Sequence, residues 1–274
     1  MATLTDLRKR LRGVQTICQL AGAMRTVSSA KLARLNAVTY AFSPYAQGCR
    51  DLLKASGGTI LPPAAGENKT LAVLLSGNRG LCGSYHSELF AFYHALTEIK
   101  DAEVITCGKM AASHLGERGA AVLEDFPVSD VPDYHEAEAL ADRILELYTA
   151  GRVKRVLFIY SEAVNAMVQK PRCLELLPGS EASAAETREL LWLPDLPAAQ
   201  EGLAELCLRA EVYSLLLNCA MAVQGATLSS MRSAYDNGKK SAGELETAIN
   251  RQRQTQVTAS VIETSSGLRP MEEG

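Results

Sequence analysis

Residues Leu217–Ile249 read LNCAMAVQGATLSSMRSAYDNGKKSAGELETAI, and this stretch decides the fold. It lies within one long predicted helix, from about Leu203 to Ile262, that no proline interrupts. Its seam residues recur at alternating steps of four and three, the heptad spacing of a left-handed coiled coil: Leu217, Met221, Gln224, Leu228, Met231, Tyr235, Gly238, Ala242, Leu245 and Ile249. Because a helix gains most of its stability by burying one face, this one needs a partner.

The predicted partner is the N-terminal segment of the same chain, residues 3 to about 55. Proline removes a helical hydrogen bond, so Pro44 predicts a kink or an interruption near Phe42–Ser43. We expect residues 1–56 and 203–274 to form a long antiparallel two-helix coiled coil. The N-terminal seam residues again approximate the four/three spacing: Leu4, Leu7, Leu11, Val14, Cys18, Ala21, Met24, Val27, Leu32, Leu35 and Val38.

The middle of the chain, residues 68–200, has a different pattern. A linker rich in glycine and proline, at 56–58 and 62–66, precedes it. Strand-like and helical segments then alternate, which predicts an inserted Rossmann-like α/β domain with a mostly parallel sheet. The predicted strands are Thr70–Ser76, Ala102–Cys107, Ala120–Leu123, Val153–Tyr160 and Cys173–Leu177, and the helices follow Ser84 and cover Lys109–Glu117 and His135–Thr149. Residues 178–200 are predicted as a loop or weak hairpin.

Composition excludes several classes of protein. The chain has 274 residues, 47% of them hydrophobic, and a net charge of −3, so a packed core is expected and general nucleic-acid binding is not. The seven cysteines are scattered without a C-x-x-C pair, which argues against a zinc knuckle or a disulfide framework. We expect no secretory signal peptide and no membrane-spanning helix.

Charge is unevenly distributed along the chain. Asp6 is the only acidic residue among residues 1–36, which carry Arg8, Lys9, Arg10, Arg12, Arg25, Lys31 and Arg34. A basic end on a mildly acidic protein is typical either of binding to an acidic partner or of a solvated helix face. The stretch from Glu124 to Glu138 is acidic, and we interpret its carboxylates as solvated.

The turn Gly77–Gly83 resembles a phosphate-binding loop only in outline, a strand followed by glycines and a helix. Its spacing, G-x-x-G-x-x-G, matches neither dinucleotide-binding nor P-loop motifs. We interpret it as a tight turn that exposes Arg79, with Ser84 capping the next helix. A helix N-terminus can lower the pKa of a thiol such as Cys82, although a packed thiol is the favoured interpretation.

The sequence offers no convincing catalytic constellation. The histidines at 86, 94, 114 and 135 lack metal-ligand spacing, so we predict no catalytic site, no metal and no cofactor. The polar segment Asn250–Gln256 fits either simple solvent exposure or hydrogen bonding to another protein.

Several ordered segments resemble the gamma subunit of F-type ATP synthases. NRGLCGSYHS at 78–87 resembles the family motif D-R-G-L-C-G-G-x-N-[ST], which is its most distinctive internal one. Other matches are AMRTVSSAKL at 23–32, Pro44-Tyr45, VNAMVQKP at 164–171, MRSAYDNGKK at 231–240, and Asn250, Arg253, Gln254 and Thr258 in N-K-x-R-Q-A-x-I-T.

The resemblance implies a non-catalytic rotor subunit. In this family the paired terminal helices stand inside the alpha–beta hexamer, and the α/β domain lies against the epsilon subunit and the membrane c-ring. Ion flow turns the ring and the shaft, which drives the beta subunits through their nucleotide states. The resemblance further implies a peripheral protein on the cytoplasmic face of a bacterial cell membrane, attached only through the complex.

Residue by residue, the resemblance implies contacts with the beta subunit. Arg25, Lys31, Arg79 and Cys82 are candidates for contact with its acidic loop, and Arg253 and Gln254 fall where the family hydrogen-bonds a beta loop. The chain departs from the family where Asn78 replaces an aspartate, Val223 and Thr227 replace a glutamate and an arginine, and Ser260 replaces an acid. Its acidic tail, Pro270–Gly274, is a further departure.

Two other functions stay open at this stage. One is a nucleotide-binding α/β enzyme with a helical oligomerisation arm, and the other is a coiled-coil adaptor unrelated to ATP synthases. Binding of ATP or NAD to the isolated chain would favour the enzyme.

Overall fold

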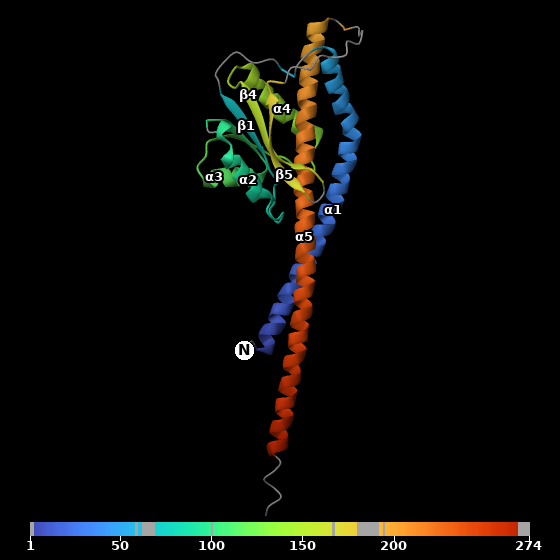
Figure 1. Ribbon diagram of the computed structural model, residues 1–274, viewed down its shortest axis with the longest axis vertical. Helices are drawn as coiled ribbons and strands as arrows, with labels where there is room; N and C mark the ends of the chain where they lie inside the picture. The colour runs from blue at the N-terminus through green and yellow to red at the C-terminus, as the bar shows by residue number, and fades with distance from the viewer. Residues whose placement is uncertain are drawn as a thin grey trace, which may run out of the picture. The chain divides into compact units, whose positions relative to one another are not determined.

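The computed structural model divides the chain into two compact units (Figure 1). We call Met1–Thr26 with Ser230–Gly274 the terminal-helix unit, and Val27–Ser229 the α/β unit. Both units share the long helices α1, Leu4–Ala55, and α5, Leu196–Gly267. The structure describes residues 3–57, 60–61, 69–99, 101–165, 168–179, 192–193 and 195–267. The predicted linker at 62–66 and the tail Pro270–Gly274 lie outside the described residues, as do 180–191 of the predicted loop.

In the terminal-helix unit, α1 and α5 run antiparallel along the predicted seam. Gly238 of α5 lies against Cys18 of α1, and Gly22 of α1 lies against the ring of Tyr235. Most of the α5 residues from 231 on that are not exposed keep the four/three spacing, which confirms this part of the predicted seam and extends it by one position: Met231, Tyr235, Gly238, Ala242, Leu245, Ile249 and Gln252. Ala234 and Ala248, which are also half-buried, lie beside this seam. Side chains 253–265 are exposed, because α5 continues past the start of α1 (Figure 1).

The structure differs from the prediction for α1 at two places. Val27 is 53% exposed, and Ser28, at 4%, takes its place on the buried face, because strict four/three steps from Ala21 lead to Ser28. Pro44 does not interrupt the helix, which runs on to Ala55. Burial on both sides of this proline holds the helix together: Phe42 packs edge-on against Tyr213 of α5 with ring centroids 4.7 Å apart, and Ala46, Cys49 and Leu53 are buried.

The described part of the α/β unit contains a five-stranded sheet in the order β3-β2-β1-β4-β5. The first four strands are parallel, and β5 pairs antiparallel with β4 at one edge. The strands are β1 Thr70–Leu75, β2 Glu103–Cys107, β3 Val122–Phe126, β4 Arg155–Ala163 and β5 Gln169–Leu177. The mostly parallel α/β prediction is confirmed, with β3 lying two to three residues later than expected.

Helices cover both faces of this sheet. Right-handed crossovers in this strand order place α2, Tyr85–Ala95, and α3, Lys109–Glu117, on one face and α4, Tyr134–Thr149, on the other. A short 3₁₀ helix, Thr97–Ile99, follows α2. Figure 1 shows α4 on the side of α5, and the ion pair Arg209–Asp142 of 2.9 Å joins these two helices.

Helix α5 begins at Leu196, earlier than predicted, and its first half belongs to the core of the α/β unit. Leu208, Val212 and Leu216 are at most 2% exposed. One stretch of α5 is long and apolar enough to cross a bilayer, but 61% of it is buried inside the protein. Packing against the sheet therefore accounts for its apolar character.

The close approach at Gly238 can be tested by substitution. A Cβ at this position would lie closer to the sulfur of Cys18 than real Cβ contacts allow. We expect Gly238→Ala to destabilise the pairing by about 1–3 kcal/mol through overpacking, measured by urea unfolding followed by circular dichroism.

Gly243→Ala is the matched control, because a Cβ there meets no atom within 4 Å. We expect this change to stabilise the helix by about 0.5–1 kcal/mol. The double variant Gly238→Ala with Cys18→Ala should recover most of the loss. Equal effects of the two glycine substitutions would contradict the close contact.

Candidate functional site

The carboxyl ends of β1 and β2, where open α/β sheets bind nucleotides, are covered by α5. Cys219 and Val223 of α5 face Ser76, Cys107 and Val128 across this crevice. The space left is a cavity of about 20 Å³, which holds one water molecule at most. A nucleotide has no room here, so nothing in this crevice favours the alternative of a nucleotide-binding enzyme.

The turn Gly77–Gly83 has the tight geometry that the sequence predicts. Leu81 and Gly83 have φ angles of 65° and 63°, and Leu81 is 59% exposed. Gly77 is packed so closely against Val223 that an added Cβ would lie 3.0 Å from a valine methyl group. Ser84 precedes α2 but its side chain makes no capping bond, contrary to the prediction; its carbonyl oxygen instead accepts from Ser87 Oγ at 2.8 Å.

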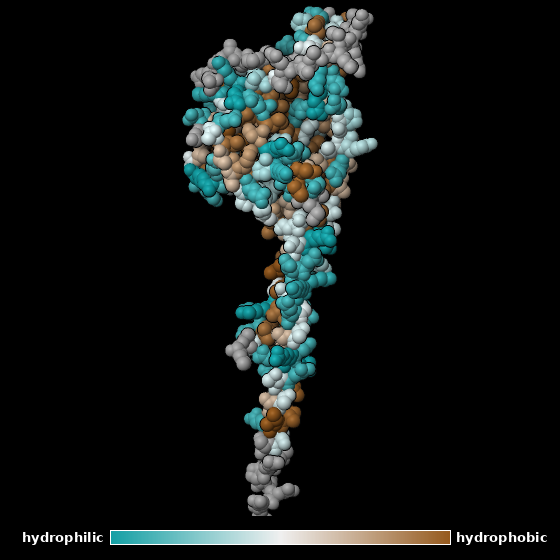
Figure 2. Space-filling view, in the orientation of Figure 1, coloured by the Kyte–Doolittle hydropathy of each residue, from teal (hydrophilic) through white to brown (hydrophobic). Residues whose placement is uncertain are grey.

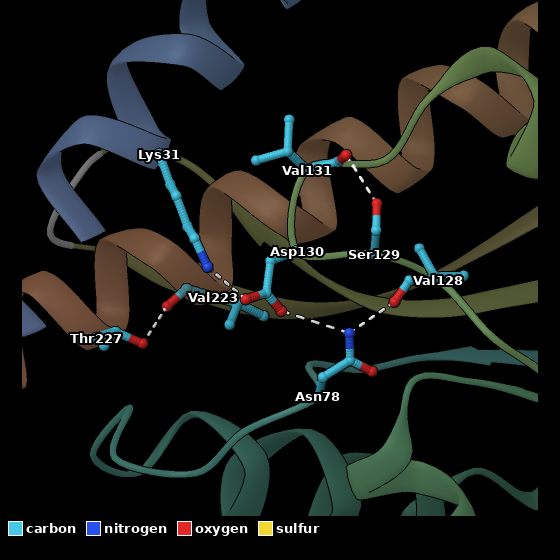
Figure 3. Close-up of polar contacts among 8 residues, drawn as sticks. All are labelled: Lys31, Asn78, Val128, Ser129, Asp130, Val131, Val223 and Thr227. Atoms are coloured by element: carbon cyan, nitrogen blue, oxygen red, sulfur yellow. Dashed lines mark hydrogen bonds and ion pairs between the residues drawn. The ribbon is translucent and has the colours of Figure 1, made fainter. Parts of the chain in front are cut away.

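A polar junction lies beside this turn (Figure 3). Lys31 Nζ of α1 pairs with Asp130 Oδ2 at 2.5 Å, and Asn78 Nδ2 donates to the carbonyl oxygen of Val128 at 2.6 Å. Asn78 Nδ2 also lies 3.4 Å from Asp130 Oδ1. We call Lys31, Asn78 and Asp130 the junction, because it ties α1, the turn and the loop after β3 together.

Electrostatics favour the ionised form of Asp130. Burial by itself raises the pKa of this carboxyl group, but hydrogen bonds from Lys31 and Asn78 and the positive charges of Lys31 and Arg79 outweigh it. The net effect is a pKa below the ordinary value for aspartate. The structure thus brings two predicted site residues, Lys31 and Arg79, around a carboxylate of the same chain.

Three departures from the family motifs meet at this place. Asn78 belongs to the junction, and Val223 and Thr227 lie beside it on α5 (Figure 3). Val223 is 8% exposed and Thr227 is 7% exposed. The Thr227 hydroxyl donates to the carbonyl oxygen of Val223 at 2.8 Å, so it needs no outside partner. Where the resembled motif has a glutamate and an arginine, this chain has an apolar side chain and a hydroxyl group that is satisfied within α5.

Arg25 is engaged within the terminal-helix unit. Its guanidinium carbon lies 4.8 Å from the ring centroid of Tyr235, and Lys239 Nζ lies 5.3 Å from the same centroid. Cations are attracted to the electron-rich face of an aromatic ring. Arg25 is therefore half-buried against α5 instead of extending freely from the helix.

The other predicted site residues divide into exposed and buried ones. Arg79 in the turn and Arg253 and Gln254 on the last part of α5 are exposed, so their partner contacts stay predictions. Cys82 is only 4% exposed, and burial raises the pKa of its thiol. This confirms the interpretation of Cys82 as a packed thiol. The expected lowering of its pKa is wrong, because desolvation outweighs the effect of the helix N-terminus. In this structure Cys82 does not present its side chain to a partner.

The acidic residues from β3 to the start of α4 make specific contacts, although the sequence analysis interpreted them as solvated. Glu124 pairs with Arg143 at 2.9 Å, and Asp133 accepts from the backbone N–H of Glu136 at 3.0 Å to cap α4. Because these carboxylates were interpreted as solvated, the sequence did not single out Asp130 as a site residue. The only available signal was an acidic loop set against a basic first helix.

Comparisons with known proteins agree with this architecture. The family model described as ATP synthase matches residues 3–271. An ATP synthase gamma chain of Rhizobium johnstonii is 30% identical over 294 residues, covering 99% of this chain and 100% of the relative. One of Desulfitobacterium hafniense is 26% identical over 281 residues, covering 99% and 100%.

Solved structures show the same fold at lower identity. A chain in the OSCP/F1/c-ring part of Euglena gracilis mitochondrial ATP synthase has a TM-score of 0.72 and 17% identity, with 99% of this chain and 97% of that chain covered. One in the central stalk and c-ring of the Tetrahymena thermophila mitochondrial enzyme has a TM-score of 0.60 and 21% identity, with 78% and 99% covered. With matching sequence over its whole length, this chain belongs to the ATP synthase gamma-chain family.

Proposed function

We propose that this chain is the central-stalk rotor subunit of a bacterial F-type ATP synthase. It couples ion-driven rotation of the membrane c-ring to conformational change at the catalytic sites of the beta subunits. It acts without a catalytic site or cofactor of its own, and its partners are the alpha–beta hexamer, the epsilon subunit and the c-ring. It is held at the cytoplasmic face of the cell membrane through these subunits.

One observation carries the proposal beyond family membership. Helix α5 continues past its pairing with α1, and side chains 253–265 are exposed over several turns. An isolated helical segment of this length is marginal in water without packing. A surrounding protein sleeve supplies that packing, and Val257, Val261 and Ile262, which are 56–62% exposed, are the apolar residues to fill it.

The surface of the paired helices suits a part that turns against its surroundings. Figure 2 shows polar and neutral side chains along it, with hydrophobic ones in separate patches. A shaft of this kind biases each beta subunit by contacting its alternative conformations differently, since a ligand shifts an equilibrium only through differential affinity.

The junction holds α1 against the loop after β3 within the α/β unit. Arg50 of α1 also pairs with Glu211 of α5 at 3.0 Å, so α1 is fixed to both the loop after β3 and the C-terminal helix. We infer that torque passes from the α/β unit into the helices through these contacts.

Reconstitution tests the proposed function. Purified full-length chain, mixed with the alpha and beta subunits of the same genome, should form a complex with one copy of the chain per alpha–beta hexamer, seen by native mass spectrometry. ATP hydrolysis should rise above that of alpha and beta alone. Failure to join the hexamer would overturn the proposal.

Variants of the last part of α5 test its predicted contacts. A charged hydrogen bond contributes about 1.5–3 kcal/mol, so we expect Arg253→Ala with Gln254→Ala to weaken hexamer binding by about tenfold or more. Arg251→Ala with Gln256→Ala removes the same kinds of exposed side chain from the same helix and is the matched control. Equal losses in both pairs would contradict specific contacts at Arg253 and Gln254.

A double-mutant cycle tests the junction. For this partly exposed pair we expect a coupling free energy of about 0.5–1 kcal/mol between Lys31→Ala and Asp130→Ala, measured by urea unfolding at pH 7. Because the pKa of Asp130 is lowered in the folded state, the stabilisation is complete above the pKa of unfolded aspartate. It is lost as the pH falls through the folded value and the carboxylate is protonated.

Arg34→Ala, which removes an exposed cation from the same helix, controls for a general effect of charge. Its effect on stability should be small and should show no coupling to Asp130→Ala. A Lys31–Asp130 coupling that persisted at pH 2 would contradict an ion pair.

Restoring the family aspartate by Asn78→Asp should harm this chain. The change removes the donor to the carbonyl oxygen of Val128 and places a second carboxylate beside Asp130. We expect a loss of about 1–3 kcal/mol in the free energy of unfolding at pH 7, which shrinks as the pH falls and the new carboxyl group is protonated. Asn237→Asp, on the exposed surface of α5, should change stability far less.

A further inference from the structure

Two histidines that are distant in sequence meet on the surface of the α/β unit. His94 lies in the last turn of α2 and His114 in α3, and their Nε2 atoms are 3.0 Å apart. Their separation of twenty positions in the sequence hides this pair from any search for a local metal-binding motif. Their spacing in the sequence therefore gave no indication of a shared role.

The ring of His114 is held in a fixed orientation. It stacks on Phe90 with ring centroids 4.0 Å apart and an angle of 14° between the planes, and Phe90 is itself buried, at 6% exposed. The ring of His94, which is more exposed, lies edge-on to Tyr93. One imidazole is thus in place before any ligand arrives, and the second has only to adjust to it.

The nitrogen atoms of both rings already face a cation. Arg118 Nη1 lies 3.0 Å from Nε2 of His94 and also contacts Nε2 of His114. The same nitrogen lies 3.2 Å from Nδ1 of His114, so the guanidinium group, which can only donate hydrogen bonds, contacts both nitrogen atoms of that ring. Ring nitrogens of two histidines therefore converge on one positively charged side chain.

The protonation state suits a ligand role. Burial, followed by the charge of Arg118, lowers the pKa of both imidazoles below the ordinary value for histidine, although the charge of Glu117 acts in the opposite direction on His114. Neutral imidazole is the form that binds metal ions. Burial, the larger cause, remains when Arg118 moves away from the rings.

We propose that His94 and His114 form a two-imidazole site for a borderline divalent transition metal such as Ni²⁺, Cu²⁺ or Zn²⁺. Metal–nitrogen bonds of about 2.0–2.1 Å place two coordinated imidazole nitrogens about 3 Å apart, as they are here. Imidazole is a preferred ligand of these ions. Binding requires the flexible side chain of Arg118 to move away from the position between the rings.

The site is open and not a closed structural centre. Among the residues that the structure describes, no group of three or more His, Cys, Asp or Glu side chains is placed to hold a metal ion. The chain therefore supplies two ligands and leaves the other coordination positions to water. A bound ion would link α2 to α3 on one face of the sheet.

Calorimetry with Ni²⁺ on the full-length chain, prepared without an affinity tag, tests the proposal. We expect saturable binding of one ion, weakened by at least about tenfold in His94→Ala and in His114→Ala, because each removes one of two ligands. Arg118→Gln, which removes the competing charge, should tighten binding several-fold. His135→Ala is the matched control, because its side chain is 91% exposed and belongs to another helix, and it should leave binding unchanged.

Electron paramagnetic resonance of bound Cu²⁺ gives a second readout that does not depend on affinity. Two coordinated nitrogens are expected in the unmodified chain and one in His94→Ala, whose exposed position makes misfolding an implausible cause. Absence of saturable binding, unchanged binding in both histidine variants, or loss of binding in His135→Ala would each overturn the site.

Discussion

The mutual burial of α1 and α5 is the constraint on which the rest of the structure depends. Each helix has an apolar stripe too narrow to stabilise it alone. In the terminal-helix unit, small residues such as Gly238 opposite Cys18 let the helices approach closely. In the α/β unit, Phe42 against Tyr213 and Arg50 with Glu211 continue the antiparallel pairing. Because this pairing joins the two ends of the chain, everything between them is an insertion.

Periodicity made this architecture predictable. The seam from Met231 to Ile249 and helix α3 could be predicted from spacing. In both, the face of its own element on which a residue lies decides whether it is buried, and that face repeats with the period of the helix. The misses are of another kind. Pro44 remains helical because Phe42, Cys49 and Leu53 pack around it, and this tertiary burial outweighs a local preference. Ser28 is buried because of its position on the helix and despite its polarity.

The candidate site was less predictable because pair interactions across long sequence separations leave no periodic signal. The family resemblance drew attention to Lys31 and Arg25 as cations for a partner, yet each has a partner within the chain. Lys31 is 99 residues from Asp130, and Arg25 meets Tyr235 on the opposite helix. The burial of Cys82 likewise depends on how the turn packs, which its glycine spacing does not specify. Arg79, Arg253 and Gln254 are exposed, so for these residues the structure is compatible with the partner contacts that the family motifs imply.

The departures at Asn78, Val223 and Thr227 make physical sense only as a set. Val223 and Thr227 are buried and need no charge partner. Asn78 supplies a donor where a carboxylate would repel Asp130, and Asp130 in turn is balanced by Lys31. The junction thus holds one balanced charge pair, Lys31 with Asp130, which ties α1 to the loop that follows β3.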